Sequence, residues 1–359
     1  MLGSLLSPFS EDIGIDLGTA NTHVYVRGKG IVVREASVVA VHRKTGAVLA
    51  AGKEAKKMVG KAPENIRVVR PLREGVISDF EIAEKMLSLF IGRVRRTPSR
   101  FSRIFRPRMV VGIPSGITEV ERRAVRDAAL QSGAREAYLI EEPMAAALGA
   151  GLPISASEGS LIVDIGGGTT EIAVISLGGI VVGKNLRVAG DKMTESIAQY
   201  AREKYNLLLG EQTAEKVKIE VGNACEENAK RKTQNAKLKA SEGKTPLGVM
   251  RGRDLKTGLP KSVILSPEEA REALRGPLMR IIDAVKDVVE ATPPELLSDV
   301  LARGVALAGG GSLLRGADQL LAKETGVPVK VASDPMTSVV RGCGKVLDDR
   351  NLLERVRVR

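Results

Sequence analysis

The sequence predicts an α/β protein made of two duplicated domains, each a mixed sheet flanked by helices, folded around a common cleft. Three observations predict this fold class. The chain of 359 residues is too long for one ordinary core and suits two. A strand-and-glycine pattern at 15–22 returns at 163–170, which indicates duplication. Elsewhere, strand-like and helix-like stretches alternate along the chain.

Composition limits the class of protein. Hydrophobic residues make up 43% of the chain and charged residues 27%, which is enough for a sizeable core. No apolar run approaches the roughly 18 residues that span a bilayer, and residues 1–9 lack the basic start of a secretory signal. The formal net charge of +12 favours an acidic partner, either anionic lipid or nucleic acid. We therefore expect a cytoplasmic protein that is soluble or peripheral to a membrane.

The repeated sequence motif is the most informative feature. The first copy reads IDLGTANT at 15–22 and the second reads VDIGGGTT at 163–170. The two aspartates, Asp16 and Asp164, lie 148 positions apart (164 minus 16), which suits a duplicated domain and not a solenoid repeat. Each copy predicts a strand, a glycine turn and a returning strand, because β-branched residues flank a turn of small residues.

Between the copies, the sequence predicts a helix, a short strand and a second helix. Thr118 and Glu121 stand at capping-box spacing at the start of a helix over 118–131. Residues 137–140 predict the strand, and Pro143 stands where it would open the helix at 144–148.

The second half continues the alternation. The predicted elements are, in order, helices at 192–205 and 213–221, helices at 267–274 and 278–290, a buried strand at 305–308, a helix at 313–324 after the glycine cluster at 309–311, and a last core strand at 327–332. A polar segment at 223–245 carries six Lys or Arg against three Glu, and we interpret it as a flexible insertion.

The two glycine turns have the chemistry of a phosphate site. Glycine lets backbone N–H groups approach phosphate oxygens, and threonine hydroxyls add donors. Asp16 and Asp164 follow the strands and are candidates to hold a hydrated Mg²⁺. One such turn is more often a plain tight turn, but two related turns and the cluster at 309–311 favour a nucleotide. The P-loop and Rossmann fingerprints are both missing.

These segments resemble, in order and spacing, the nucleotide-binding segments of actin-like ATPases, and over nearly the whole chain the sequence resembles the MreB family. The residues that carry the resemblance are 15–22, 114–116, 139–147, 163–170, 308–311, 251–255 and 258–261. The resemblance implies an actin-like fold with two ribonuclease H-like domains around a nucleotide cleft, each with a smaller subdomain. The implied division is large subdomain IA at 1–35, 72–150 and 330–359, small subdomain IB at 36–71, large subdomain IIA at 151–187 and 264–329, and small subdomain IIB at 188–263.

The same resemblance implies roles for individual residues, with ATP and Mg²⁺ as cofactors. Asp16 and Asp164 would hold the Mg²⁺ through water. The residues that would contact the nucleotide are Gly18, Thr19, Ala20 and Asn21 in the first phosphate loop, Gly166, Gly167, Gly168 and Thr169 in the second, Glu215, Lys216, Val217 and Lys218 beside the ribose and adenine, and Gly309, Gly310, Gly311 and Ser312 behind the base. An alternative for Glu215 and Lys218, which are three residues apart, is a plain surface ion pair.

Glu141 is the candidate for hydrolysis. It lies between the end of a strand and a helix that Pro143 opens, where a carboxylate can orient a water for attack on the γ-phosphate. Thr169 is expected to assist with the same water. The alternative is that an acid in the first turn of a helix only complements the helix dipole, which is the role expected for Glu142. Such a site predicts slow ATP hydrolysis coupled to polymerisation.

A basic and apolar segment predicts membrane contact. Between Arg93 and Arg108 there are seven arginines and no acids. Such a mixture suits a lipid headgroup interface. The apolar residues expected to enter the membrane are Phe101, Ile104 and Phe105 in this segment and Leu2, Leu5, Leu6 and Phe9 at the N-terminus. The alternatives are a solvated loop with its Phe side chains packed inward and, as the weaker one, nucleic-acid binding by stacking.

The residues and the resemblance together predict an ATP-dependent cytoskeletal filament on the inner face of the cell membrane. By resemblance, the filament organises cell-wall elongation and rod shape. The expected partners are further copies of the chain, anionic lipid and membrane proteins of wall elongation. Two alternatives share the scaffold: a small-molecule kinase, for which we identify no catalytic aspartate, and a chaperone ATPase, for which we find no substrate-binding domain. The preference between ATP and GTP stays open.

Overall fold

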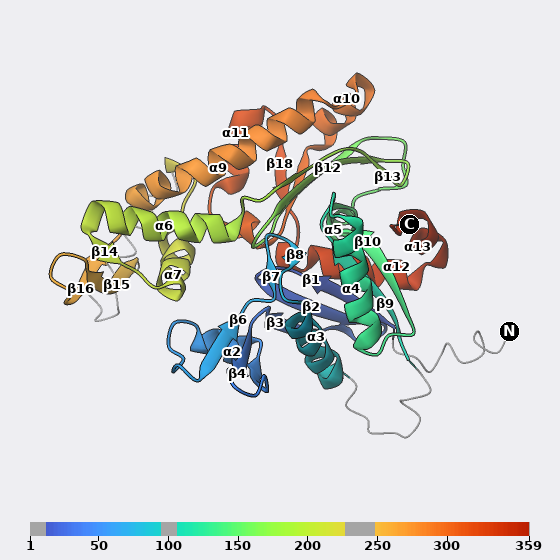
Figure 1. Ribbon diagram of the computed structural model, residues 1–359. Helices are drawn as coiled ribbons and strands as arrows, with labels where there is room; N and C mark the ends of the chain where they lie inside the picture. Colours follow the sequence, from blue (N-terminus) through green and yellow to red (C-terminus); the bar gives the residue numbers. More distant parts are fainter. Residues whose placement is uncertain (1–11, 95–105, 227–247, 359) are drawn as a thin grey trace.

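The computed structural model describes residues 12–94, 106–226 and 248–358, and two five-stranded mixed sheets organise them (Figure 1). The first sheet has the strand order β10-β9-β1-β2-β3 and the second β13-β12-β11-β17-β18. The strands of the first sheet are β1 Ile13–Leu17, β2 Asn21–Val26, β3 Gly30–Ala36, β9 Arg108–Ile113 and β10 Glu136–Glu141. Those of the second are β11 Ser160–Ile165, β12 Thr170–Ser176, β13 Gly179–Leu186, β17 Val305–Ala308 and β18 Val329–Val331.

The two sheets have the same topology, as the repeated sequence motif predicts. In the first, β1 pairs antiparallel with β2 and parallel with β9. In the second, β11 pairs antiparallel with β12 and parallel with β17. Asp16 lies opposite His23 in one hairpin, and Asp164 lies opposite Glu171 in the other. The predicted strand, glycine turn and returning strand are therefore confirmed in both copies.

Two smaller sheets extend from the large ones. One consists of β4 Val39–His42, β5 Val48–Ala51 and β6 Ile66–Val69, next to helix α2 Lys53–Met58. The other consists of β14 Leu207–Leu208, β15 Val249–Asp254 and β16 Pro260–Ile264, next to helices α6 Gly190–Tyr205 and α7 Glu211–Val221. The strands β7 Leu72–Arg73 and β8 Val76–Ile77 form a separate hairpin. The boundaries of the four subdomains stay a prediction.

Helices cover the sheets, and several begin where the sequence predicts. Thr118 caps α4 Glu119–Gln131, and the predicted capping box with Glu121 is confirmed. Pro143 stands in the first turn of α5 Glu142–Ala150, as expected. The remaining helical elements are α3 Phe80–Val94, α9 Pro267–Glu290, α10 Pro294–Arg303, the 3-10 turn η3 Gly310–Leu313, α11 Ala317–Thr325, the 3-10 turn η4 Pro335–Thr337, α12 Ser338–Asp348 and α13 Arg350–Val356.

The predicted elements differ from the structure in three places. The two helices expected at 267–274 and 278–290 are one helix, α9, which continues through Pro277. Its buried stripe of Leu274, Leu278, Ile281, Ile282 and Val285 runs unbroken along one face, and this burial outweighs the roughly 3 kcal/mol that an internal proline costs.

The other two differences lie at the end of the second sheet. The helix expected from residue 313 begins only at Ala317, because residues 310–313 form a 3-10 turn and Gly316 has a left-handed backbone. The core strand expected at 327–332 is the shorter β18, which lies at the sheet edge and pairs with β17. Its Val331 is 40% exposed, so β18 is an edge strand and not a core strand.

The helices α5 and α12 join the two halves. Helix α12 packs on β1, β2 and β9 of the first sheet, helix α5 packs on β11 and β12 of the second, and the two helices pack on each other. One hydrophobic cluster accordingly contains residues of both sheets, including Val110 and Ile162. Glycines allow this close crossing, because a Cβ added at Gly342 would overlap the carbonyl oxygen of Ala145.

Substitution of Gly342 by alanine is expected to destabilise the protein by about 1–3 kcal/mol, because overpacking forces the two helices apart. The matched control is Gly276→Ala in α9, where an added Cβ meets nothing within 4 Å. That substitution is expected to stabilise the protein by about 0.5–1 kcal/mol through the higher helix propensity of alanine. Urea denaturation of both variants measures the two effects. Equal stability of the two variants would contradict the close crossing.

The residues predicted to contact the membrane lie outside the described residues. These are Leu2, Leu5, Leu6, Phe9, Phe101, Ile104 and Phe105, and most of the polar segment at 223–245 also lies outside. Within 12–94, 106–226 and 248–358, no helix is both long and apolar enough to cross a bilayer.

Candidate nucleotide site

A cavity of about 400 Å³ lies between the two large sheets. This volume is within the usual range for small-molecule sites. Most residues singled out from the sequence line it: Asp16, Gly18, Thr19, Ala20, Asn21, Asp164, Gly166, Gly167, Gly168, Thr169, Glu215, Lys218, Gly309, Gly310 and Gly311. The two aspartates therefore face one shared cavity.

The two glycine turns face each other across this cavity. A Cβ added at Gly167 would lie 2.6 Å from the Ala20 side chain, and one added at Gly168 would lie 2.6 Å from the Thr19 hydroxyl. Both positions therefore need glycine. The backbone N–H of Gly166 donates to the carbonyl of Thr169 at 2.9 Å and closes the second turn.

Hydroxyl groups hold the first turn in place. The Ser37 hydroxyl donates to the Gly18 carbonyl at 2.6 Å and lies 2.9 Å from the Thr22 hydroxyl. The Thr19 hydroxyl accepts a hydrogen bond from the N–H of Gly75, in the turn between β7 and β8, at 3.0 Å. Ser37 and Gly75 could not be predicted from the sequence, because each acts through a tertiary contact that no local motif signals.

Several acids crowd one side of the cavity. Burial raises the pKa of Asp164 to about 7, and the charge of Asp16 adds to the effect. The pKa of Glu142 is raised well above its ordinary value, first by burial and then by the charges of Glu171, Asp16 and Asp164. Like charges that raise each other's pKa in a cavity indicate a place where a cation belongs. His23 Nδ1 lies 3.2 Å from the Asp16 carboxylate.

This donor set fits Mg²⁺ held together with a phosphorylated ligand. Among the residues with described positions, no group of three or more His, Cys, Asp or Glu is arranged to bind a metal by itself. Asp16 and Asp164 offer two carboxylates on the shared cavity. Mg²⁺ usually keeps several waters and binds through one or two carboxylates plus phosphate oxygens, which matches this arrangement.

The structure corrects the position of the catalytic candidate. Glu142, the first residue of α5, lines the cavity, whereas Glu141, the last residue of β10, is absent from the cavity lining within the described residues. Glu141 instead lies near enough to Glu171 for its charge to contribute to the raised pKa of Glu171. Consecutive residues at the end of a strand point to opposite faces, so only one of the two glutamates can face the cleft. Thr169 lines the cavity as expected.

On α7, the helix period separates the residues that line the cavity from the others. Glu215 and Lys218 line it, but Val217 is fully buried in the hydrophobic core and Lys216 is exposed and lies 3.7 Å from Glu220. Residues three apart share a helix face, and those between them do not. The expectations for Lys216 and Val217 were therefore wrong in position.

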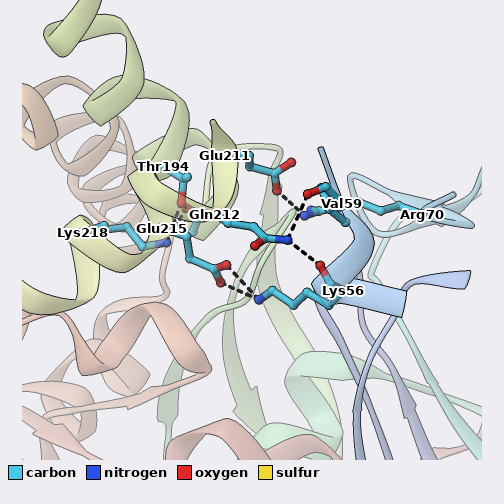
Figure 2. Close-up of polar contacts among 9 residues, drawn as sticks. Lys56, Val59, Arg70, Thr194, Glu211, Gln212, Glu215 and Lys218 are labelled. Carbon is cyan, nitrogen blue, oxygen red and sulfur yellow. Dashed lines mark hydrogen bonds and ion pairs between the residues drawn. The ribbon is translucent and has the colours of Figure 1, made fainter. Parts of the chain in front are cut away.

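The alternative of a plain ion pair between Glu215 and Lys218 is not what the structure shows. Glu215 pairs with Lys56 of the first half at 2.8 Å (Figure 2). Lys218 donates to the Gly190 carbonyl at 2.8 Å and to the Thr194 hydroxyl at 2.9 Å.

The glycine cluster at 309–311 lines the cavity together with apolar side chains, among them Leu313, Leu314 and Met336. Ser312 is buried and donates to the Gly309 carbonyl at 2.6 Å, so it supports the turn and does not line the cavity as expected. The sequence analysis missed the other lining residues, which are His23, Gly75, Glu142, Gly190, Asp191, Met193, Ile219, Gly222, Leu313, Leu314, Arg315, Pro335, Met336 and Val339.

Comparison with known proteins places the chain in a family. The family model described as MreB/Mbl protein matches residues 10–355. The chain is 48% identical over 353 residues to the cell shape-determining protein MreB of Escherichia coli K12, covering 97% of this chain and 96% of that protein. It is 46% identical over 347 residues to the cell shape-determining protein Mbl of Bacillus subtilis 168, covering 97% and 98%.

Solved structures agree with this assignment. The crystal structure of MreB5 of Spiroplasma citri bound to ADP superposes with a TM-score of 0.83 at 36% identity, covering 97% of this chain and 98% of that one. A MamK double helical filament matches with a TM-score of 0.74 at 23% identity, covering 94% of this chain and 98% of that one, which supports the fold alone. With its duplicated sheets and shared cavity, the chain has the actin-like fold and belongs to the MreB/Mbl family.

Proposed function

We propose that the protein is an ATP-dependent cytoskeletal filament protein that lies on the inner face of the cell membrane and determines cell shape by organising wall elongation. The observation that carries this proposal is the pair of glycine turns, one from each half, on one acid-lined cavity. The relatives support it, since MreB and Mbl are named as cell shape-determining proteins and MreB5 was solved with ADP and with AMPPNP.

The cavity suggests how ATP would lie. The phosphates would occupy the space between the two glycine turns, where backbone N–H groups and the Thr19 and Thr169 hydroxyls are available. The base would lie towards Gly309–Gly311, with apolar contacts from Leu314 and Met336. Mg²⁺ bound with the substrate would offset the negative charge of the phosphates and of Asp16 and Asp164.

Glu142 is our candidate for orienting the attacking water. Its carboxyl lines the cavity together with Asp16, Asp164 and Thr169, and desolvation first, then the charges of the neighbouring acids, raises its pKa. A positioned carboxylate accepts a hydrogen bond from the water and aligns it for in-line attack on the γ-phosphate. Hydrolysis here is expected to be slow and coupled to polymerisation.

A substrate between two halves provides a reason for assembly to depend on nucleotide. The two sheets meet through α5 and α12, and the cavity lies between them, so a bound nucleotide contacts both halves at once. A ligand that binds one relative position of the halves better than others stabilises that position. We propose that the nucleotide-bound position stacks into filaments of this chain, which then contact membrane proteins of wall elongation.

Membrane association is proposed from the sequence. The segment from Arg93 to Arg108 combines seven arginines with Phe101, Ile104 and Phe105, and the chain has a net charge of +12. Basic and apolar residues together favour an anionic lipid surface. A filament would multiply a weak single-subunit affinity because many subunits bind at once.

Sedimentation tests the proposal. With ATP and Mg²⁺, the purified protein is expected to pellet as filaments and to release phosphate slowly, and without nucleotide it is expected to stay in the supernatant. Vesicles that contain anionic lipid should bind the protein more strongly than neutral vesicles do, and salt should weaken that binding. Failure to assemble with any nucleotide, with or without vesicles, would contradict the filament proposal.

A further inference from the structure

Helix α2 of the first half and helix α7 of the second meet at the edge of the nucleotide cavity, and Figure 2 shows their polar contacts. Lys56 Nζ lies 2.8 Å from the Glu215 carboxylate. Gln212 donates its side-chain N–H to the carbonyl of Val59 at 3.2 Å and also to that of Lys56. Arg70, just after β6, pairs with Glu211. Each contact joins the first half to the second.

The contacts on α7 come from one face of the helix. Glu211 and Glu215 are four residues apart and share a face of the helix. Glu215 and Gln212 reach α2, and Glu211 reaches Arg70 just after β6. Gln212 bonds to carbonyls at the C-terminal end of α2, which ends at Met58. The Lys56 carbonyl also accepts from the N–H of Val59 at 3.2 Å, and Val59 follows the last residue of the helix, so the amide of Gln212 adds a donor at the helix end.

The contact between α2 and α7 separates the nucleotide cavity from an outer groove. The outer groove is lined by Lys53, Lys56, Lys57, Gln212, Glu215, Lys216, Ile219 and Glu220. Glu215 and Ile219 also line the nucleotide cavity. The Lys56–Glu215 pair and the Gln212 bonds therefore lie at the boundary between the cavity and the open groove.

Helix α7 also reaches the second phosphate turn. One turn after Glu215, the mostly buried Lys218 donates to the Gly190 carbonyl at 2.8 Å. The N–H of Gly190 in turn donates to the Gly166 carbonyl at 3.1 Å. A displacement of α7 away from α2 would therefore disturb both the cavity boundary and the support of the turn.

We propose that these contacts form a clasp, the α2–α7 clasp of Lys56, Val59, Arg70, Glu211, Gln212 and Glu215, that holds the cavity closed and limits how fast nucleotide leaves the monomer. The inference rests on the proposed function, because it assumes that the cavity holds a nucleotide. A nucleotide between the halves leaves when the halves separate, and separation at this side breaks every clasp contact. An exposed ion pair changes an equilibrium by a factor of roughly 1.4 to 5, so loss of several contacts is measurable.

A charge swap tests the clasp with residues that do not line the cavity, since Arg70 and Glu211 are both absent from its described lining. Both charges act on Asp191, which does line it, so the double swap, which keeps their sum unchanged, is the deciding variant. The monomer is loaded with tritiated ADP, chased with unlabelled ADP and sampled by rapid filtration. Arg70→Glu and Glu211→Arg are each expected to accelerate release about 3–10-fold, because each places like charges opposite one another. The double swap is expected to return the release rate to within about twofold of the native protein.

A second variant and a control complete the test. Lys56→Gln combined with Gln212→Ala removes the other contacts and is expected to accelerate release about 5–20-fold. Lys57→Gln is the matched control, since the Lys57 ammonium pairs with Glu54 of its own helix at 2.7 Å. Its release rate should equal the native rate.

The possible results distinguish failure of the clasp proposal from failure of the proposed function. Unchanged release in Arg70→Glu and in the Lys56/Gln212 variant, with normal ADP binding, would overturn the clasp alone. A double swap that releases ADP as fast as the single variants would also overturn it. Failure of the native protein to bind ADP would overturn the clasp and the proposed function together.

Discussion

Glu142→Gln is expected to lower the rate of ATP hydrolysis by roughly 10²–10⁴-fold while ATP binding and filament assembly persist. Glutamine keeps the size of the side chain but accepts a proton from the attacking water far less well. The variant should fold, because it replaces a half-buried acid, whose pKa is raised first by desolvation, with a neutral group of equal size. Filaments of this variant are expected to persist longer, since ATP is not consumed. Phosphate release and ATP binding, measured on the same preparation, check the prediction.

The matched control is Glu141→Gln. Glu141 precedes Glu142 in the chain but does not line the cavity within the described part of the structure. Its substitution is expected to change hydrolysis less than about tenfold. The reverse result, with Glu141→Gln inactive and Glu142→Gln active, would restore the interpretation from sequence and exclude Glu142 as the water-orienting residue.

The part of the site that sequence predicts well is local. Each glycine turn is a contiguous pattern of small residues between β-branched strands, and the turn itself dictates that pattern. The duplication adds independent support because it repeats the pattern in a second sheet. Asp16, Asp164 and both turns consequently line the predicted cavity.

On α7 and at the start of α5, the predictions placed the wrong residues on the face that lines the cavity. Ala214, Val217 and Val221 recur at intervals of three and four, which marks a buried stripe and places Val217 in the core. That signal was available in the sequence. The choice between Glu141 and Glu142 had no such signal, because it depends on where strand β10 passes into helix α5.

Other residues could not be predicted from one sequence. Gly75, Gly190, Pro335 and Met336 reach the cavity only because distant segments fold beside the two turns. Each is an ordinary residue type with no local motif. Pro277 shows the opposite case, in which a strong local rule predicted a break that tertiary burial along α9 overrides.

Glu171→Gln is expected to stabilise the nucleotide-free protein at alkaline pH. Glu171 lies opposite Asp164 in the second hairpin and is 1% exposed. Neither of its carboxylate oxygens has a hydrogen-bond partner of ordinary geometry among the described residues. Burial first, and then the charge of Asp164, raises the pKa of Glu171 from 4.5 to about 8, and the nearby backbone and hydroxyl of Ser115 only partly oppose this. An ionised carboxylate is therefore costly at this position.

The sign of the pH dependence follows from proton linkage. Between pH 4.5 and about 8 the native protein keeps a proton on Glu171 that the unfolded chain has lost, so unfolding releases it. As pH rises, Glu171 therefore lowers the free energy of unfolding more and more. The loss is complete above pH 8, where the carboxylate is ionised in the native protein as well. The change in pKa corresponds to an upper limit of roughly 5 kcal/mol, and relaxation reduces this to about 1–3 kcal/mol.

Urea denaturation at pH 5 and pH 8.5 measures the difference between Glu171→Gln and the native protein. We expect this difference to shift by about 1–3 kcal/mol in favour of the variant between pH 5 and pH 8.5. Glu290→Gln, at the exposed end of α9, is the control and should show no such change. Asp164 titrates in the same range and its charge raises the pKa of Glu171, so the difference between the variants reports the coupled pair of acids. The prediction is wrong if the variant is less stable than the native protein at pH 8.5. That result would show that the ionised Glu171 carboxylate has a stabilising partner, because ionising a buried carboxylate that lacks a partner destabilises the protein.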